Sequence, residues 1–254
     1  PIRPRGSAIS RFWIGGCFAY LPMVSVPFTF QGVEYRQTLF AWSEGLDPDG
    51  RLWAYVGLEM KNPTGAAVHV ELAQQAVCGR KQRVVPLGSW EYDLAAGQAR
   101  RLCLRIPRDG ILPDTEITKD SPEFGKRTGS AELPFCGGFQ GVETIEPQDF
   151  DRCFGEAAQA WRQRLTRAMT IRVPEQRVND AHRAWLAYLF TNVDKEGDLY
   201  FPHDGSGFYE LVWGIAAIQS CRAFDMYGYA EEAGKYLDSI CTLVRPDGEL
   251  KTAF

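Results

Sequence analysis

The segment from Asp194 to Glu210 carries the residue types that cleavage of a glycosidic bond requires. This reaction needs two carboxyl groups, one to protonate the leaving oxygen and one to activate water or attack the sugar. It also needs aromatic side chains, because the faces of a sugar ring are apolar while its rim is polar. The segment combines acids, aromatic residues, a histidine and glycines, so it predicts a sugar-binding site.

Glu210 is the strongest catalytic candidate in this segment. It lies near the start of an otherwise apolar stretch, Phe208–Tyr227, that is expected to form a helix. A buried carboxylate must be paired or functional, and Trp213 would project from the same helical face three residues later. We therefore predict Glu210 as catalytic, with Tyr209 and Trp213 binding substrate. The alternative is that Glu210 only stabilises the positive end of the helix dipole.

His203 and Asp204 are predicted as further substrate-binding residues. His203 is one of three histidines, and the other two, His69 and His182, are expected on a strand and a helix as surface or packing residues. Asp204 is followed by Gly205, a pair that is also typical of a plain turn. Both interpretations of Asp204 stay open at this point.

Motifs for other chemistries are missing from the sequence. It contains no G-x-x-x-x-G-K, no H-E-x-x-H and no G-x-S-x-G. The seven cysteines include no C-x-x-C pair, so we expect free thiols rather than a disulfide framework or a zinc site. The run Phe135–Gly138 is more typical of a glycine turn than of a thiol nucleophile. We accordingly expect no metal and no cofactor.

Composition excludes several classes of protein. The 254 residues are 45% hydrophobic and 24% charged, which is typical of a globular chain. A net charge of −4 without a basic block argues against a nucleic-acid partner. The longest apolar run, near Gly214–Ile218, is too short for a membrane span. The chain begins at Pro1 without a signal segment and stops after a turn, so we expect an internal fragment, for which a missing signal assigns no compartment.

The apolar period is two up to about Arg108. Alternate residues are apolar from Leu52 to Met60, and the pattern recurs at 68–72 and 102–106. Turn sequences at 47–50, 62–65 and 95–98 separate these segments. The pattern predicts an antiparallel β-sandwich over residues 1–110. An irregular connection is expected over 111–150, with a short strand near 132–139 as a candidate to close the sheet.

After Phe150 the apolar period becomes 3.6. A linker helix is expected over 151–173, ending before Pro174 because a residue that precedes proline avoids helical space. Residues after about 151 are therefore expected to be almost entirely helical. Trp161 and Trp185 are predicted core residues, and Glu175 is a predicted helix cap. The other helices are expected at 180–193, capped by Asn179 or Asp180, at 208–227, ended by Gly228, and at 230–244.

These helices need neighbours, because a helix that is apolar nearly all round is buried on more than one side. Three such helices cannot bury one another completely, so we expect them to pack against further helices beyond Phe254. The loops at Pro202–Gly205 and Pro246–Gly248 each follow a helix and indicate a structural repeat.

The order of these parts resembles the six-hairpin glycosidases, in which a β-supersandwich precedes an (α/α)6 toroid. The resemblance implies a multidomain chain of α and β structure: an N-terminal antiparallel β-sandwich, then the first helices of a toroid over 174–254, with the remainder of the toroid as its partner. The segments that carry it are Trp161–Leu165, Ile171–Glu175, Asn179–Leu186, Gly207–Gly214 and Tyr227–Ala233, together with Leu94–Gly97 and Leu102–Pro107 in the sandwich.

The resemblance implies a glycoside hydrolase acting on an oligo- or polysaccharide, with loops that open onto a central cleft. The sequence departs from the glucoamylase-like members, which carry Trp-x-Arg-Asp where Trp213 is here followed by Gly214–Ala216. In many relatives the general acid comes from a later hairpin. A sugar phosphorylase or polysaccharide lyase on the same toroid, and a non-catalytic carbohydrate-binding scaffold, remain alternatives.

Overall fold

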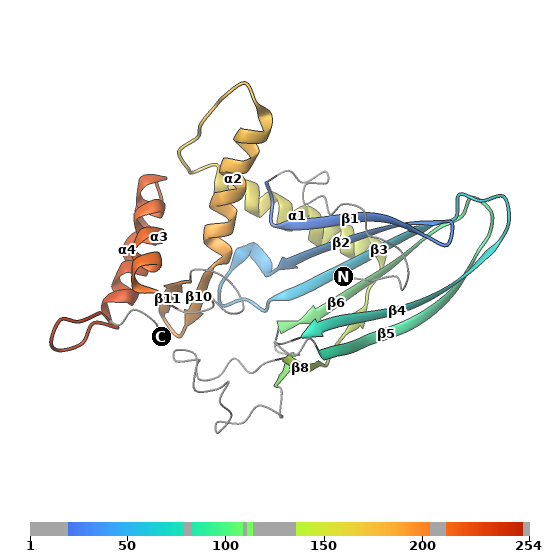
Figure 1. Ribbon diagram of the computed structural model, residues 1–254, viewed down its shortest axis with the longest axis horizontal. Helices are drawn as coiled ribbons and strands as arrows, with labels where there is room; N and C mark the ends of the chain where they lie inside the picture. The colour runs from blue at the N-terminus through green and yellow to red at the C-terminus, as the bar shows by residue number, and fades with distance from the viewer. Residues whose placement is uncertain (1–19, 79–82, 109–110, 114–135, 204–211, 251–254) are drawn as a thin grey trace. The chain divides into compact units, whose positions relative to one another are not determined.

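The computed structural model describes residues 20–78, 83–108, 111–113, 136–203 and 212–250 (Figure 1). The chain divides into two compact units. The first comprises residues 1–115 and 134–160, and the second comprises residues 116–133 and 161–254. The division after residue 160 falls within a helix, α1 (Pro147–Leu165).

A five-stranded antiparallel sheet forms the centre of the first unit. Its strands are β1 (Met23–Phe30), β2 (Val33–Trp42), β3 (Trp53–Lys61), β6 (Ala99–Pro107) and β9 (Glu143–Thr144), in that spatial order. A short 3-10 turn, Glu44–Leu46, lies between β2 and β3. The sheet confirms the antiparallel β-structure predicted from the period of two, because alternate residues of β2 and β3 face opposite sides.

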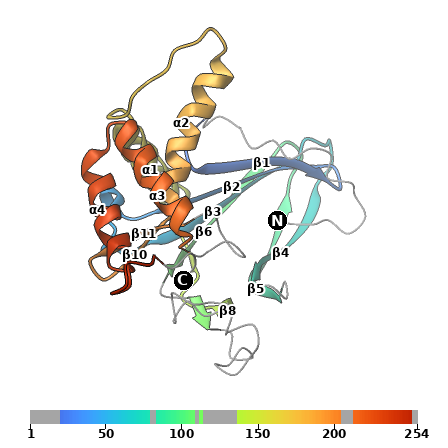
Figure 2. The same cartoon turned by 60° about the vertical axis from the view of Figure 1, so that its left-hand side comes forward.

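A long hairpin of β4 (Val68–Cys78) and β5 (Arg83–Leu94) packs against one face of this sheet. Its buried Val70, Leu72 and Leu94 belong to the same apolar cluster as Leu58 and Leu104 of the five-stranded sheet. Figure 2 shows the two strands set apart from the plane of β1, β2 and β3. The apolar positions of the alternating pattern therefore fill the space between two antiparallel layers.

Asn62 joins two of the predicted turns and is fully buried. Its side-chain nitrogen donates to the carbonyl oxygens of Ala66 at 2.8 Å, Leu94 at 3.0 Å and Ala95 at 3.0 Å. Its side-chain oxygen accepts from the backbone N–H of Thr64 at 3.0 Å. One amide group thus ties the turn after β3 to the turn after β5, which explains how a buried polar residue is tolerated here.

Helix α1 docks on the opposite face of the sheet through Phe150, which is 1% exposed. The Phe150 ring meets the Phe40 ring edge to face, with ring centroids 5.3 Å apart. Gly57 leaves the space for this ring, since a Cβ atom at that position would lie 2.6 Å from Phe150 Cζ. The missing side chain of Gly57 therefore lets the helix approach the sheet closely.

The segment predicted as an irregular connection contains more regular structure than expected. Strands β7 (Ile111–Pro113) and β8 (Cys136–Phe139) pair in a separate two-stranded sheet, so the prediction that a strand near 132–139 closes the main sheet is wrong. Strand β9 takes the edge position beside β6 instead. Helix α1 also begins earlier than predicted, at Pro147, because the fixed φ of proline suits the first turn of a helix.

The second unit contains α2 (Gln176–Thr191), α3 (Gly214–Met226) and α4 (Ala230–Cys241). Glu175 occupies the N-cap position of α2, as predicted. The prediction of Asn179 or Asp180 as the cap is wrong, because the Asn179 side chain instead bonds both the N–H and the carbonyl of Val173, each at 2.9 Å. Gly228 follows α3 with a φ of 91°, which confirms the predicted left-handed end of that helix.

The expectation that residues after about 151 are almost entirely helical is wrong for the segment that follows α2. Strands β10 (Val193–Glu196) and β11 (Leu199–Pro202) form an antiparallel hairpin directly after α2. Gly197 has a φ of 59°, a value that favours glycine, and the two-residue turn Gly197-Asp198 reverses the chain between the two strands. Helix α3 begins at Gly214, whereas the sequence predicted a helix from Phe208. Residues 208–211 of that predicted helix lie outside the described part.

The end of α2 and the end of α4 share one local pattern. After α4, a bridge between Val244 and Leu250 closes a second small hairpin, in which Gly248 has a φ of 84°. The same four residue types recur with the same spacing after the two helices. They are Thr191, Val193, Gly197 and Leu199 after α2, and Thr242, Val244, Gly248 and Leu250 after α4. A helix followed by a turn therefore occurs twice, while Asp204 and Gly205 of the predicted loop repeat lie outside the described residues.

Aromatic rings form the core of the second unit. Phe190 contacts Phe224 and Tyr229 edge to face, with centroids 4.8 Å and 5.0 Å apart. Trp161 is 8% exposed and contacts Phe190, which confirms it as a core residue. Trp185 is 52% exposed, so its predicted place in the core is wrong. The face of α2 that carries Leu186 and Leu189 is the buried one.

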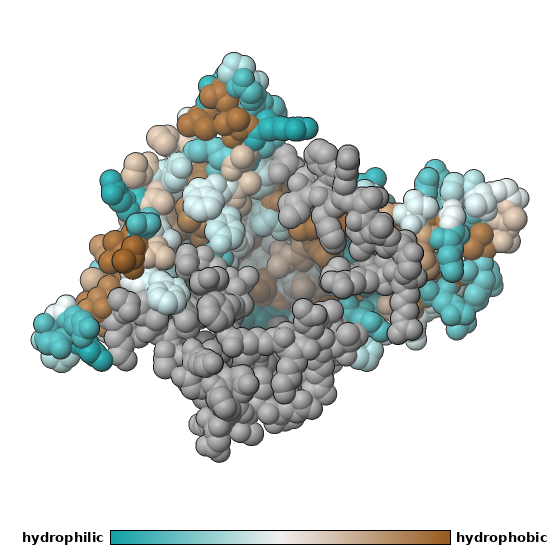
Figure 3. All heavy atoms as spheres, in the orientation of Figure 1, coloured by the Kyte–Doolittle hydropathy of each residue, from teal (hydrophilic) through white to brown (hydrophobic). Residues whose placement is uncertain are grey.

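Helices α2 and α3 each carry several exposed apolar side chains, and α4 exposes Leu237. Figure 3 shows apolar surface, in brown, near the start of α2. The Trp185 and Tyr188 rings stack on each other, with centroids 5.5 Å apart, on the outer face of this helix. The side chains concerned are Val178, Trp185 and Tyr188 on α2 and Ile215, Ile218 and Met226 on α3.

Candidate functional site

The hairpin of β10 and β11 brings His203 and Asp194 together. Asp194 lies on β10, and His203 follows the last residue of β11. The Nε2 atom of His203 lies 3.2 Å from an Oδ2 atom of Asp194, and the histidine side chain is only 12% exposed. The His203 N–H donates to the carbonyl oxygen of Asn192 at 2.7 Å, which fixes the backbone at this point.

The second ring nitrogen of His203 has no hydrogen-bond partner among the described residues. This atom, Nδ1, is buried. In the neutral tautomer that carries its proton on Nε2, next to Asp194, Nδ1 is an acceptor, and a second proton converts it to a donor. The pair can therefore hold a hydroxyl group or exchange a proton at Nδ1.

Helix α4 holds this hairpin in place. The N–H of Tyr200 donates to the Ser239 hydroxyl at 2.8 Å, and this hydroxyl donates to the Lys235 carbonyl at 2.9 Å. Lys235 Nζ also lies 3.7 Å from the centroid of the Tyr200 ring. Phe201 is buried as well. A short hairpin is marginal alone, so these contacts explain why His203 has a defined position.

Trp213 lies immediately before α3 rather than inside it. Its backbone is extended, with φ −82° and ψ 116°, and it occupies the N-cap position. The argument that Glu210 and Trp213 share a helical face three residues apart is therefore wrong. The indole Nε1 atom of Trp213 is buried and has no hydrogen-bond partner in the structure as described.

Three of the predicted site residues, Asp204, Tyr209 and Glu210, lie outside the described residues. His203 and Trp213 border the segment 204–211 that contains them. The other two histidines have the surface and packing positions that were predicted. His69 is exposed and bonds Asp93 at 2.7 Å, and His182 packs against the Tyr227 ring at a centroid distance of 5.1 Å.

Asp194 is the residue whose role the sequence did not reveal. It was one of several acids in the segment, and only a hairpin places it beside His203. The sequence signal for this hairpin was Gly197 between two short segments, one with Val193 and Lys195 and the other with the buried Phe201. A glycine turn between two short alternating segments is typical of a hairpin.

Other ionisable groups of this unit have structural roles. Glu232 is 13% exposed and lies 3.7 Å from Arg164 and 3.6 Å from Arg167, so it connects α4 to the end of α1. The Tyr229 hydroxyl donates to the Arg164 carbonyl at 2.6 Å. Burial raises the pKa of Tyr236 to about 12. This tyrosine is therefore a poor acid or base near neutral pH.

The described residues contain neither an activated thiol nor a cluster of metal ligands. Cys103, Cys153 and Cys221 are buried free thiols, and Cys241 is exposed. Burial raises the pKa of Cys103 and of Cys221 to about 11, which disfavours the nucleophilic thiolate. Within the described ranges, no group of three or more His, Cys, Asp or Glu side chains is placed to hold a metal ion.

The helices of the described chain include none that combines the length and apolar character needed to cross a membrane. Comparison of the chain with protein-family models, with curated proteins and with solved structures found no match. What the site does is therefore inferred from its own residues.

Proposed function

We propose that this chain is part of a carbohydrate-active enzyme, a glycoside hydrolase that cleaves glycosidic bonds with paired carboxyl groups. The observation that carries the proposal is the His203–Asp194 pair, with a buried Nδ1 atom that no described residue bonds. It borders the segment that contains Asp204, Tyr209 and Glu210. A histidine oriented by a carboxylate, beside aromatic and acidic residues, suits the hydroxyl groups of a sugar.

In this proposal each residue has a separate role. Glu210 protonates the leaving oxygen or activates water, and the second carboxyl group comes from a later hairpin. His203 Nδ1 and Asp204 bind sugar hydroxyls. Tyr209 and Trp213 offer aromatic faces to the sugar ring, and the Trp213 indole N–H adds a donor. Asp194 fixes the orientation of His203 and does not itself contact the substrate.

The helical part fits the beginning of an (α/α)6 toroid. A toroid repeats pairs of helices, and the helix-and-turn pattern after α2 recurs after α4. Neighbouring pairs would also cover the apolar side chains that α2 and α3 expose, Trp185 and Ile215 among them. Exposed apolar surface of this kind marks a contact with another element.

Turnover of a panel of oligosaccharides by the full protein tests this proposal. Glu210→Gln keeps the size of the side chain but removes the acid, so we expect turnover to fall about 10²- to 10⁴-fold while the protein stays folded. Asp198→Asn is the matched control, because Asp198 is an exposed acid in the turn of the hairpin. Equal turnover of wild type and Glu210→Gln would remove Glu210 from the reaction.

A further inference from the structure

The first unit contains a groove of about 710 Å³ on its five-stranded sheet, within the size range of small-molecule sites. Strand alternation places Arg36, Glu59 and Arg101 on the same face as Gly57, and thus on the face that α1 covers elsewhere. The groove is lined from four strands, and its polar and apolar residues include Pro27, Thr29, Arg36, Glu59, Lys61 and Arg101.

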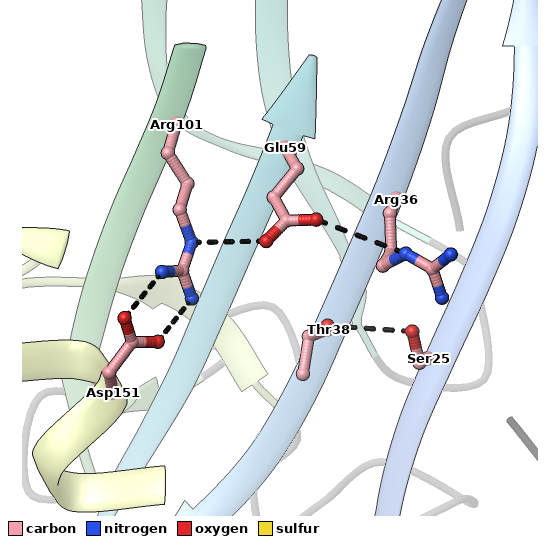
Figure 4. Close-up of polar contacts among 6 residues, drawn as sticks. All are labelled: Ser25, Arg36, Thr38, Glu59, Arg101 and Asp151. Carbon is pink, nitrogen blue, oxygen red and sulfur yellow. Dashed lines mark hydrogen bonds and ion pairs between the residues drawn. The ribbon is translucent and has the colours of Figure 1, made fainter. Parts of the chain in front are cut away.

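Four charged side chains of alternating sign cross this face (Figure 4). Asp151 of α1 accepts two hydrogen bonds from the Arg101 guanidinium, at 2.8 Å and 2.7 Å. Arg101 Nε then lies 3.5 Å from Glu59 Oε1, and Glu59 Oε2 lies 3.9 Å from Arg36 Nε. The docking of α1 therefore determines the position of Arg101, and through it the position of Glu59.

The two ends of this row differ in how fully their hydrogen-bonding groups are used. Arg101 and Asp151 form a close bidentate pair through the two Nη atoms, while the buried Nε atom of Arg101 makes only the ion contact with Glu59 and no hydrogen bond to a described residue. Glu59 makes only the two longer ion contacts and no hydrogen bond to a described residue. The Nη atoms of Arg36 point away from Glu59 in Figure 4. The side chains of Arg36 and Glu59 are about half exposed, at 49% and 52% respectively.

We propose that this groove binds a saccharide that carries a carboxylate, such as a uronic acid unit. Arg36 offers the carboxylate its two Nη donors, which bond no described residue, and Lys61, which lines the same groove, adds a second positive charge. Glu59 accepts hydrogen bonds from neighbouring hydroxyl groups. Pro27 and the methyl group of Thr29 give the ring an apolar edge.

Charge balance favours a ligand with one negative charge per sugar unit. Four basic side chains line the groove, Arg36, Lys61, Arg100 and Arg101. The acids are Glu34 and Glu59 of the lining and Asp151, which bonds Arg101, so one positive charge is left unmatched. A dianionic phosphate would meet repulsion from these carboxylates, whereas one carboxylate can bind at Arg36 without approaching Glu59. Donors and acceptors that alternate along the groove suit hydroxyl groups, which do both.

The choice of a saccharide over a simple carboxylic acid rests on the proposed function, while the binding of a carboxylate does not. Isothermal titration calorimetry on the full chain distinguishes recognition of a saccharide from binding of any carboxylate. The probes are trigalacturonate, neutral cellotriose and succinate. We expect binding of trigalacturonate at least tenfold tighter than binding of either comparator. Succinate binding as tightly as trigalacturonate, or cellotriose binding as tightly, would overturn the proposal.

Variants locate the site. Arg36→Gln removes the guanidinium and should weaken trigalacturonate binding about 10- to 100-fold, because hydrogen bonds between charged groups are among the strong ones. Arg152→Gln is the matched control, since Arg152 is an exposed arginine of the same unit that pairs with Asp149 and Glu156 outside the groove. Unchanged binding by Arg36→Gln, or an equal loss in Arg152→Gln, would overturn the assignment.

The outcomes for the groove and for the proposed enzyme activity are independent. Glu210→Gln should bind trigalacturonate with wild-type affinity, because Glu210 belongs to the other unit. Loss of turnover in that variant with intact binding supports both proposals. Absence of turnover in the wild type with intact binding contradicts only the proposed activity, and absence of binding contradicts only the groove.

Discussion

Gly57 is expected to be a position where a single methyl group destabilises the first unit. Its Cβ atom would lie 2.6 Å from Phe150 Cζ and 3.0 Å from Cε1, whereas ordinary contacts begin near 3.4 Å. The ring would have to move by about 1 Å in a well-packed interior. It is held against the Phe40 and Tyr55 rings, at centroid distances of 5.3 Å and 6.3 Å. Gly57→Ala should therefore cost about 1–3 kcal/mol of unfolding free energy.

A double-mutant cycle with Phe150→Ala tests the cause of this cost. Phe150→Ala alone should cost about 3–5 kcal/mol, because it removes a fully buried aromatic ring. In that background the ring is gone, so Gly57→Ala should cost almost nothing. The coupling energy between the two sites is then about equal to the cost of Gly57→Ala alone.

Urea unfolding followed by circular dichroism measures the four proteins of the cycle. Gly155→Ala is a matched control, because Gly155 is exposed in α1 and a Cβ atom there meets nothing within 4 Å. This control should gain about 0.5–1 kcal/mol from helix propensity. If Gly57→Ala costs the same with and without the Phe150 ring, the proposed contact is not the reason for glycine at this position.

Two further predictions concern stability. Asn62→Asp and Asn62→Ala should each cost about 2–4 kcal/mol in urea unfolding, because neither can donate to the three carbonyl groups that Asn62 bonds; a cost below 1 kcal/mol would contradict that role. Burial raises the pKa of Cys221 to about 11 and of Tyr236 to about 12, so the unfolded chain releases these protons first. The contribution of these two groups to the free energy of unfolding should be constant below their ordinary pKa values of 9.0 and 10.0 and should fall as the pH rises past them, as unfolding at a series of pH values would measure; a rise over that range would contradict the burial of these groups.

The sheet was predictable because one physical rule governs most of it. Strand β3 has one face buried against other strands, so its apolar residues alternate from Val56 to Met60. The turns at 62–65 and 95–98 carry the polar and glycine residues that a chain reversal needs, and Gly228 has the positive φ that its sequence position suggested. Local pattern and tertiary structure agree at these places.

The failures have a different origin. Trp185 is apolar and lies in a helix, but only the packing of Leu186 and Leu189 decides which face of α2 is buried. The apolar run before Gly214 reads as helical, yet Trp213 has an extended backbone. The pairing of Asp194 with His203 depends on the β10–β11 register, which brings together residues that are apart in sequence. Apolar spacing alone does not carry this information.

The mass of the products formed from a defined oligosaccharide tests the central claim most directly. Hydrolysis adds one water across the broken bond, so both products should be saturated sugars with free hydroxyl groups. A phosphorylase would leave a sugar phosphate, and a lyase would leave a product without added water. We predict the water-added products from the full protein and about a 10²- to 10⁴-fold lower initial rate of their formation by Glu210→Gln. A sugar phosphate, an unsaturated product or an uncleaved substrate would contradict the proposal that this chain belongs to a glycoside hydrolase.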